Sequence, residues 1–543
     1  MEEKILTPYM VWQDFNPVKE ALEVSIIGSE STPDYKKIEY FFTSKNADDG
    51  KLRVFTQVFY KQGSTKKMPC VLFVQDYDGA IDMQMVKGFT DEGYAVVTFD
   101  YLGKKENKEN CTVYPPSLEY GNIAKAGEHL TKATPNAKAT CVYLWSKVGR
   151  RVISFIETMS FIDCDKIACI GNNNGADIMW QITAMDGRVK VGVPINNIGW
   201  KYAIQNENVL SDEAQRWVIG CANQSYVNLV RVPIFYAGGT NSNISNFDKL
   251  EETLHLLDRN QTEVKYCLSA GLGNQIEQSS FNTIVKFLNH IFFNKTDFAE
   301  KPTISYKVGE ELEINVVIDD ATVVSKVVLN ISYNEQNPLQ RNWEKEMLNC
   351  NFLGESTYRT QISSFMKTFY AFCNIYYKDG TMLSTSVITG ELPKVLNSEV
   401  GSRILYEVKY GVSDFFAETN EFFIEDELVH IGSGAMELRG ICTKKGALAT
   451  HTINGMQFVP EDINLLQFDT FSNTATTFYV ELLQDTEKYF CKLTLKQAEW
   501  CKFALSLQDF KDVNMIPMKN WKNIKKLSFR YAENVLFNNI LWV

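Results

Sequence analysis

The run Ile170–Ala176, which reads IGNNNGA, is the part of this sequence whose residue types and spacing say most about chemistry. A buried strand pattern precedes it, a helical pattern follows it, and Gly171 and Gly175 flank Asn173. In a nucleophile elbow, G-x-S-x-G, the glycines tighten the turn so that the middle side chain projects above the sheet. Here the middle residue is asparagine. Because an amide has no hydroxyl to activate, Asn173 cannot form an ordinary acyl-enzyme.

Alternating strand and helix patterns surround this turn over the first 300 residues. Residues 1–60 hold short alternating runs typical of an antiparallel lead-in sheet. Continuous apolar runs predict strands buried on both faces at 69–74 and 94–100, and further strands are predicted at 166–170, 189–195, 232–237 and 263–268. Helical patterns cover 83–92, 139–159 and 281–293. This alternation predicts an α/β domain with a mostly parallel sheet and helices on both faces.

The helical periodicity disappears after Lys301. About 95 residues of alternating strands predict an Ig-like β-sandwich, and the β-patterned last 150 residues predict a jelly roll. The fold class is therefore α/β followed by two all-β domains. We expect the α/β domain at 1–297, the sandwich at 298–395 and the jelly roll at 396–543.

Three further segments, together with the elbow, carry a family resemblance. They are Tyr114–Asn122, Trp145–Arg151, and Asp186–Ile195 with Gly199 and Trp200 after it. On these residues, positions 8–297 resemble the acetyl xylan esterase and dienelactone hydrolase branch of the α/β-hydrolase superfamily. The resemblance implies a Ser-Asp-His triad, with the acid in the turn 239–243 and the histidine in the loop 272–276.

Neither the acid nor the histidine is present at the implied positions, which hold Ser242 and Asn274. The five histidines lie elsewhere, at His129, His255, His290, His430 and His451. No catalytic residue of the triad is intact. The degenerate site consists of the triad positions and the elbow residues, namely Asn173, Ser242, Asn274, Gly171, Asn174 and Gly175. Joint loss of nucleophile, acid and base predicts that serine-hydrolase turnover is absent.

Other residues could serve a different chemistry in the same pocket. The loop Gln75-Asp76-Tyr77 lacks an HGGG-type oxyanion sequence, although its backbone could still donate an N–H, so these three residues are candidate oxyanion or pocket residues. Asp76, Asp78 and Asp177 are candidate catalytic carboxylates, with exposed or capping roles as the commoner alternative. Cys169 and Cys267 fall inside strand patterns, which favours buried structural thiols over nucleophiles.

The C-terminal 150 residues resemble carbohydrate-binding jelly rolls of the galactose-binding type. The resemblance rests on Leu466–Asp469, Trp521–Phe529 and Phe537–Trp542. Trp500 and Trp521, like Trp542, could offer flat faces to sugar rings, and core packing is the favoured alternative for each. The acidic segment 421–427 reads as a solvated loop rather than a calcium site.

Composition narrows the function classes. The 543 residues carry a formal net charge of -11, which removes a whole-chain electrostatic case for nucleic-acid binding. No run of about 18 apolar residues exists, so no membrane association is expected. The N-terminal segment carries acids where a signal peptide has bases, which predicts a cytoplasmic protein. The 12 cysteines are scattered and form no CxxC, so we expect free thiols, no metal site and no cofactor.

Two readings in different classes follow. The first is a catalytically degenerate α/β-hydrolase that acts by binding a ligand, such as a glycan or acyl-sugar, or as an assembly partner, including a homo-oligomer. The alternative is an active carbohydrate esterase that uses other residues, which would make it a carboxylic-ester hydrolase.

Overall fold

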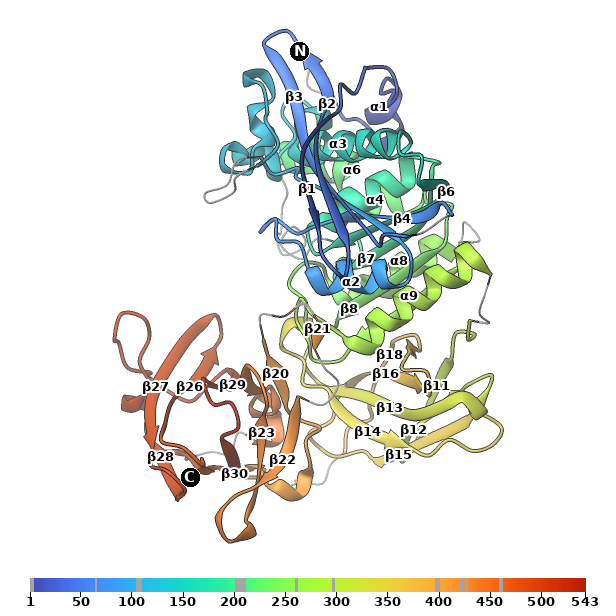
Figure 1. Cartoon of the computed structure of the whole chain (residues 1–543). Helices are drawn as coiled ribbons and strands as arrows, with labels where there is room; N and C mark the ends of the chain where they lie inside the picture. The colour runs from blue at the N-terminus through green and yellow to red at the C-terminus, as the bar shows by residue number, and fades with distance from the viewer. Residues whose placement is uncertain are drawn as a thin grey trace. The chain divides into compact units, whose positions relative to one another are not determined.

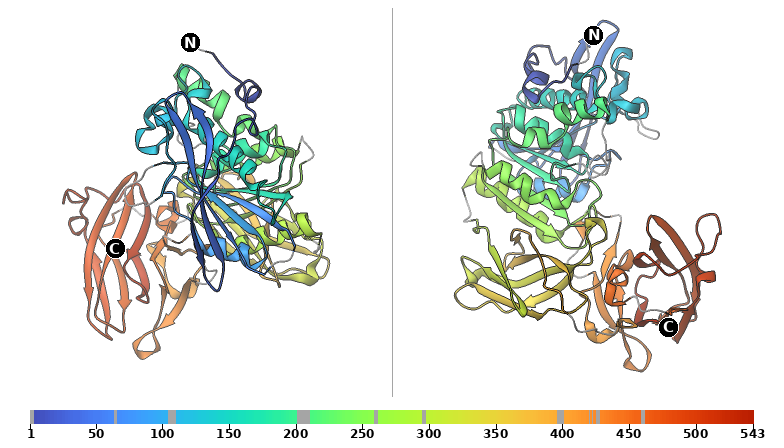
Figure 2. Two further views of the ribbon diagram at one scale, coloured as in Figure 1. Left: turned by 45° about the horizontal axis from the view of Figure 1, so that its top comes forward. Right: turned by 180° about the vertical axis from the view of Figure 1, so that it is seen from behind.

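The computed structural model describes residues 4–63, 66–103, 110–200, 211–258, 262–294, 298–395, 401–419, 421, 423–424, 428–458 and 462–543. The chain forms two compact units (Figures 1 and 2). The first comprises Met1–Gly238, Ser242–Tyr266 and Asn282–Phe298. The second comprises Gly239–Asn241, Cys267–Phe281 and Ala299–Val543. Two short segments before residue 297 thus group with the second unit, a division that the predicted domain boundaries do not contain.

A nine-stranded sheet has the order β1-β2-β3-β5-β4-β6-β7-β8-β9. Its strands are β1 Ser25–Ser31, β2 Lys36–Ala47, β3 Gly50–Tyr60, β4 Met68–Val74, β5 Ala95–Phe99, β6 Ile162–Asn172, β7 Val189–Ile195, β8 Ile234–Gly239 and β9 Val264–Ser269. From β1 to β5 neighbouring strands pair antiparallel, and from β5 through β4, β6 and β7 to β8 they pair parallel. The antiparallel lead-in and the parallel centre are both as predicted.

Helices cover this sheet on both faces. They are α1 Pro8–Trp12, α2 Met83–Asp91, α3 Cys141–Ile156, α4 Gly175–Met185, α6 Asp212–Cys221, α7 Gln224–Val227, α8 Leu250–Asp258 and α9 Gln278–Phe293. Figure 1 shows α3 and α4 on one face, with α2 and α9 on the other. Short 3₁₀ turns join β5 to α3, at Pro116–Gly121, Ile123–Lys125, Gly127–Leu130 and Ala137–Ala139. The three helices expected from periodicity are confirmed, with ends that differ by a few residues.

The core of the first unit lies between the sheet and α3. Thr140 caps this helix by accepting a hydrogen bond from the Tyr143 N–H, which satisfies one of the free N–H groups of the first turn. On the buried face, the Phe155 ring stacks on Phe42 of β2 and meets Tyr40 edge-on, both at 5.1 Å between centroids. Burial of such aromatic surface supplies much of the stability of a core.

The second unit consists largely of β-strands, as the loss of helical periodicity predicts. In 303–391 one sheet has the order β11-β12-β15 and another β14-β13-β16-β17, with β18 beside β16. The bounds are β11 Thr303–Val308, β12 Glu311–Val317, β13 Val324–Tyr333, β14 Glu344–Leu348, β15 Glu355–Gln361, β16 Thr368–Tyr377, β17 Met382–Ser384 and β18 Ile388–Glu391.

The last 140 residues hold two further antiparallel sheets. One has the order β22-β23-β30-β25-β28, with β19 beside β30, and the other β20-β24-β29-β26-β27, while β21 pairs with β10. The bounds are β10 Ile276–Glu277, β19 Ile404–Tyr406, β20 Phe416–Glu418, β21 Phe423–Ile424, β22 Val429–Ser433, β23 Arg439–Thr443, β24 Ala447–Thr450, β25 Leu466–Phe471, β26 Thr476–Gln484, β27 Glu487–Leu495, β28 Trp500–Leu505, β29 Ile524–Arg530 and β30 Leu536–Trp542. The Phe529 and Phe537 rings, from different sheets, stack at 3.9 Å in the shared core.

Two expectations about the whole chain concern thiols and membranes. All 12 cysteines are free, as their scatter predicts. Among the described residues, no helix combines the length and the apolar character that crossing a membrane requires.

Candidate functional site

The turn between β6 and α4 places Asn173 at its tip. Its φ is +49°, a left-handed conformation that asparagine adopts more readily than most residues. The two flanking glycines have no room for a side chain. A Cβ at Gly175 would overlap the carbonyl oxygens of Val74 and Gln75 at the end of β4. These close backbone approaches are the physical reason for the glycine spacing in the sequence.

Both ends of the Asn173 amide are hydrogen-bonded inside the protein. Its Nδ2 donates to Asp76 Oδ2 at 3.0 Å, and its Oδ1 accepts from Asn196 Nδ2 at 3.1 Å. Its backbone carbonyl accepts from Asn197 Nδ2 at 3.0 Å, and its N–H donates to Ile195 O at 3.0 Å. The side chain is buried, at 8% exposed. Asn173 is therefore a fixed part of a polar network rather than a free group facing solvent.

Asp177 continues this network beneath the elbow. Its carboxylate lies in the first turn of α4 and accepts from Asn197 Nδ2 at 2.8 Å and from Asn223 Nδ2 at 2.6 Å. All three side chains are buried. Asp177 was a candidate catalytic carboxylate in the sequence, and the structure shows it as an acceptor that holds two amides. A buried carboxylate needs such donors to offset its desolvation.

The two aspartates of the loop after β4 differ in what they contact. Asp76 turns to the elbow and is half-buried, whereas Asp78 is exposed and its Oδ1 accepts from the Ala80 N–H at 2.9 Å. A carboxylate that closes its own turn in this way is a common loop feature. Of the two, only Asp76 contacts a predicted site residue.

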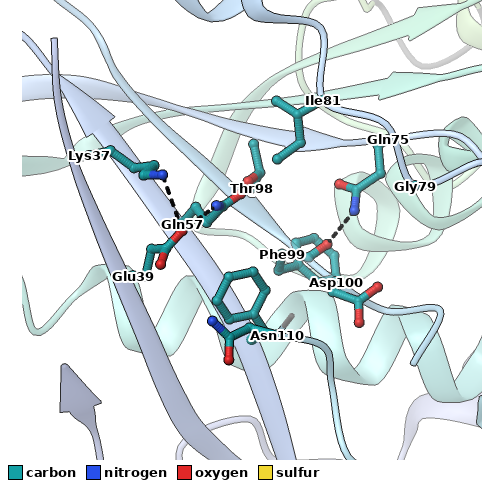
Figure 3. A pocket seen from close by; sticks show the side chains of 11 residues that line it. Lys37, Glu39, Gln57, Gln75, Gly79, Ile81, Thr98, Phe99, Asp100 and Asn110 are labelled. Carbon is teal, nitrogen blue, oxygen red and sulfur yellow. Dashed lines mark hydrogen bonds and ion pairs between the residues drawn. The ribbon is translucent and has the colours of Figure 1, made fainter. Parts of the chain in front are cut away.

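Gln75 and Tyr77, predicted as oxyanion or pocket residues with Asp76, direct their side chains away from the elbow, whereas the Tyr77 N–H donates to Asp76 Oδ1 at 2.7 Å. The Gln75 side chain donates from Nε2 to Phe99 O at 2.9 Å and lines a separate cavity of about 420 Å³ (Figure 3). Figure 3 shows Gln57 and Thr98 on the neighbouring wall of that cavity. The Tyr77 ring packs edge-on against Trp145, with centroids 5.5 Å apart. Burial raises the pKa of Tyr77 well above its ordinary value, so the phenol stays neutral.

Ser242, the position implied for the triad acid, lies after β8 and is buried. Its Oγ donates to Asn196 O at 3.4 Å and accepts from the Ile244 N–H at 3.2 Å. Asn196 thus contacts Ser242 through its backbone and Asn173 through its side chain. The structure brings these two predicted positions onto the same bridging residue.

Asn274, the position implied for the histidine, belongs to the second unit. It lies in the loop between β9 and β10 and is half-buried. In the same unit, Cys267 donates from Sγ to Met382 O at 3.1 Å, and Leu268 N donates to Ser384 Oγ at 2.8 Å. Cys267 is therefore a packed structural thiol. Burial raises the pKa of the other candidate thiol, Cys169, so it is not a nucleophile at neutral pH.

The tryptophans proposed for sugar stacking are largely occupied by protein. Trp521 is 8% exposed and packs edge-on against Trp542 at 5.2 Å between centroids. Most of the Trp521 ring is thus packed within the protein, in agreement with the core-packing alternative favoured for it from the sequence. Trp500 is half-buried, its ring lies 5.4 Å from Phe471, and its Nε1 donates to Ala435 O at 3.1 Å.

A groove of about 1160 Å³ lies instead on the outer face of the sheet that contains β26, β27 and β29. Tyr479 and Glu481 of β26 face the groove, while Phe478, Val480 and Leu482 between and beside them are buried. Arg530 of β29 donates to both oxygens of Glu481, from Nε at 2.6 Å and from Nη2 at 3.1 Å. Tyr531 beside it is 75% exposed.

Sequence reasoning missed most of the residues that make these two sites. Asn196 and Asn197 follow the apolar strand β7 directly, so their place at the carboxyl end of a strand was readable. Asn223 and Arg530 gave no comparable signal, because their partners are distant in sequence. Among the described residues, no group of three His, Cys, Asp or Glu side chains is arranged to hold a metal ion.

Comparison with known proteins gives likeness only at the level of solved structures. No family model matches the sequence, and no curated protein matches it. An acetyl xylan esterase from a Paenibacillus species is 11% identical over 51% of this chain and 91% of its own, with a TM-score of 0.37. A glucuronoyl esterase from Solibacter usitatus is 10% identical over 50% and 86%, with a TM-score of 0.39. A protein described as a dienelactone hydrolase, from Klebsiella pneumoniae, is 12% identical over 49% and 98%, with a TM-score of 0.33.

The class of the first unit follows from its own geometry. A mostly parallel sheet with helices on both faces and a tight strand-to-helix elbow define an α/β-hydrolase-like fold.

Proposed function

We propose that this chain is a catalytically silent α/β-hydrolase-like protein whose role is to bind a ligand. The observation that carries the proposal is the amide of Asn173, which occupies the nucleophile position and is hydrogen-bonded at both ends to Asp76 and Asn196. Acyl transfer needs an oxygen or sulfur nucleophile and a base that accepts its proton. Asn173 supplies neither, and the contacts of Ser242 are those of a hydroxyl that closes a turn.

The ligand we propose is a saccharide, bound in the groove of the second unit. Two features of the groove support this class. Tyr479 and Tyr531 lie 6.0 Å apart between ring centroids, and such rings stack against the apolar face of a sugar. Arg530, which Glu481 holds through two hydrogen bonds, lies beside them, and its guanidinium can also hydrogen-bond hydroxyl groups. A few polar groups placed next to aromatic surface are typical of small-ligand sites.

The test uses the full chain and an acetylated xylo-oligosaccharide as probe. We expect titration calorimetry to detect binding, and Tyr531→Ala to weaken it about tenfold, the loss of about 1.4 kcal/mol of stacking. Tyr410→Ala is the matched control, since Tyr410 is also an exposed tyrosine of the second unit and lies outside the groove. Equal affinity of the two variants, or no binding by the unmodified chain, contradicts the saccharide site.

The same probe distinguishes the alternative, an active carbohydrate esterase. The observation that favours it is the Asp76 carboxylate, which lies within hydrogen-bond distance of the elbow and could orient a water. Acetate release from the probe above that of a buffer blank would favour the active esterase over the catalytically silent protein, provided that Asp76→Asn abolishes it. Light scattering on the same samples reports whether a homo-oligomer or an assembly role deserves preference over a saccharide.

A further inference from the structure

The Asp76 carboxylate occupies the place where an elbow of this kind binds negative charge. In α/β-hydrolases the oxyanion hole is made by the N–H of the residue after the nucleophile and by an N–H from the loop after a neighbouring strand. Here those donors are the N–H groups of Asn174 and Tyr77. Both donate to one oxygen, Asp76 Oδ1, at 3.2 and 2.7 Å.

Two side-chain amides complete the surroundings of this carboxylate. Asn174 Nδ2 donates to Oδ1 at 2.9 Å, and Asn173 Nδ2 donates to Oδ2 at 3.0 Å. Asn174 is the N-cap residue of α4, and its side chain makes no capping bond to the helix. The amide that would ordinarily cap the helix is thus directed to the carboxylate. The N-terminus of the 11-residue helix α4 adds a favourable dipole for a negative charge at this position.

From this geometry we infer that the oxyanion hole is retained as a carboxylate-binding site and that Asp76 is its resident ligand. The inference rests on the proposed function and deepens it, because it explains why the elbow keeps its shape without its chemistry. An external ester carbonyl or carboxylate would need the two N–H groups that Asp76 already holds. The site therefore excludes such groups while Asp76 is in place, and a small free carboxylate fits it when the side chain is removed.

The same loop contains a second aspartate, Asp78, that serves as a control for Asp76. Asp78 lies two residues away and is exposed, and its carboxylate accepts from Ala80 N within its own turn. Asp76→Ala and Asp78→Ala remove the same group and the same formal charge. They differ in whether the carboxylate occupies the proposed hole.

The experiment measures binding of trifluoroacetate by ¹⁹F NMR to the full chain and to both variants. We expect Asp76→Ala to bind with an affinity in the millimolar range, about tenfold or more tighter than the unmodified chain and Asp78→Ala, since only there do four donors lack an acceptor. Acetate should also raise the melting temperature of Asp76→Ala relative to chloride at equal ionic strength. Equal trifluoroacetate binding by all three proteins overturns the inference.

If Asp76→Ala is recovered unfolded, its refolding yield decides the question. The inference requires a higher yield in acetate than in chloride, and equal yields in the two salts overturn it. None of these measurements depends on ester turnover. Hydrolysis by the unmodified chain would therefore refute the proposed silence without altering the outcome for the carboxylate site.

Discussion

The elbow of the first unit and the groove of the second treat their polar groups in opposite ways. At the elbow, the side chains of Asn173, Asn197 and Asp177 are buried and hydrogen-bonded to one another or to the loop after β4. In the groove, Glu481 is also buried, but Tyr531 is exposed and the neighbouring surface is open over about 1160 Å³. The first region has the shape of an active site, and the second has room for a molecule.

This difference separates the retention of a fold from the retention of a function. A polar network whose members satisfy one another stabilises the protein and fixes its backbone. A site that binds a ligand must leave surface and hydrogen-bonding capacity for it. By that criterion the elbow is a structural node, and the groove is the better place to look for a ligand.

The largest effect on stability is expected from a change that disturbs the backbone of the elbow. Gly175→Ala places a methyl group against the carbonyls of Val74 and Gln75, and neither strand nor helix can move without repacking the core. We expect a loss of about 3 kcal/mol or more in the free energy of unfolding. Urea unfolding followed by circular dichroism measures it. Gly187→Ala is the control, since a Cβ there meets no atom within 4 Å.

Similar urea midpoints for the two variants would show that the elbow is not tightly packed. That outcome would also weaken the view of the elbow as a structural node.

In the second unit, the free energy of unfolding should depend on pH through one buried histidine, His451. His451 stacks on Phe416 of β20, with centroids 5.4 Å apart, and its Nδ1 lies 3.0 Å from Lys525 O, so we assign the proton to Nδ1. Burial lowers the pKa of His451 to about 4. Below pH 6.5 this histidine is protonated in the unfolded chain, whereas in the folded chain it stays neutral down to about pH 4. Stability is therefore complete above pH 6.5 and falls as the pH falls toward 4.

The expected loss from this residue is about 3 kcal/mol between pH 7 and pH 4. His451→Asn keeps a donor for Lys525 O and removes the titration, so its unfolding free energy should vary less with pH by that amount. His255→Gln, at an exposed helical position, is the control variant. An unchanged pH dependence in His451→Asn would assign the acid sensitivity to other groups.

Sequence patterns predicted the part of this molecule that local rules determine. The fully buried strand β4 was readable because a strand covered on both faces is apolar without alternation. The elbow could be predicted because its two glycines stand where the close approach of neighbouring backbone leaves no room for a side chain. Asp76 was identified as a pocket candidate, but its role was not, since four donors from two segments about 100 residues apart converge on it.

The second unit shows the same limit. Phe478, Val480 and Leu482 stand at every second position of β26 and are buried on one face of the strand, as period-two alternation predicts. The alternation did not reveal that Arg530 pairs with Glu481 on the other face, because that register depends on how β26 and β29 align. Nor could it show that residues 267–281, which run from the end of β9 through β10 to the start of α9, group with the second unit.

The smallest effect expected is that of Asn173→Ser, which restores the nucleophile of the elbow and nothing else. The serine lacks the side-chain amide that donates a hydrogen bond to Asp76 and accepts one from Asn196. Serine also adopts the left-handed conformation less readily than asparagine. We expect a loss of about 1 to 2 kcal/mol in unfolding free energy and no hydrolysis of p-nitrophenyl acetate above a buffer blank. Asn294→Ser is the matched control, because Asn294 has a similar φ of +52° at an exposed helix end. The difference between the two variants measures the network alone. If the two variants lose equal stability, the hydrogen bonds of the Asn173 side-chain amide contribute nothing to it. The conformation of the elbow would then depend on the close packing at its glycines rather than on the polar groups around it. Measurable turnover by Asn173→Ser would mean that a base is available near the turn, which is incompatible with a site in which the neighbouring carboxylates, Asp76 and Asp177, already accept hydrogen bonds from protein donors.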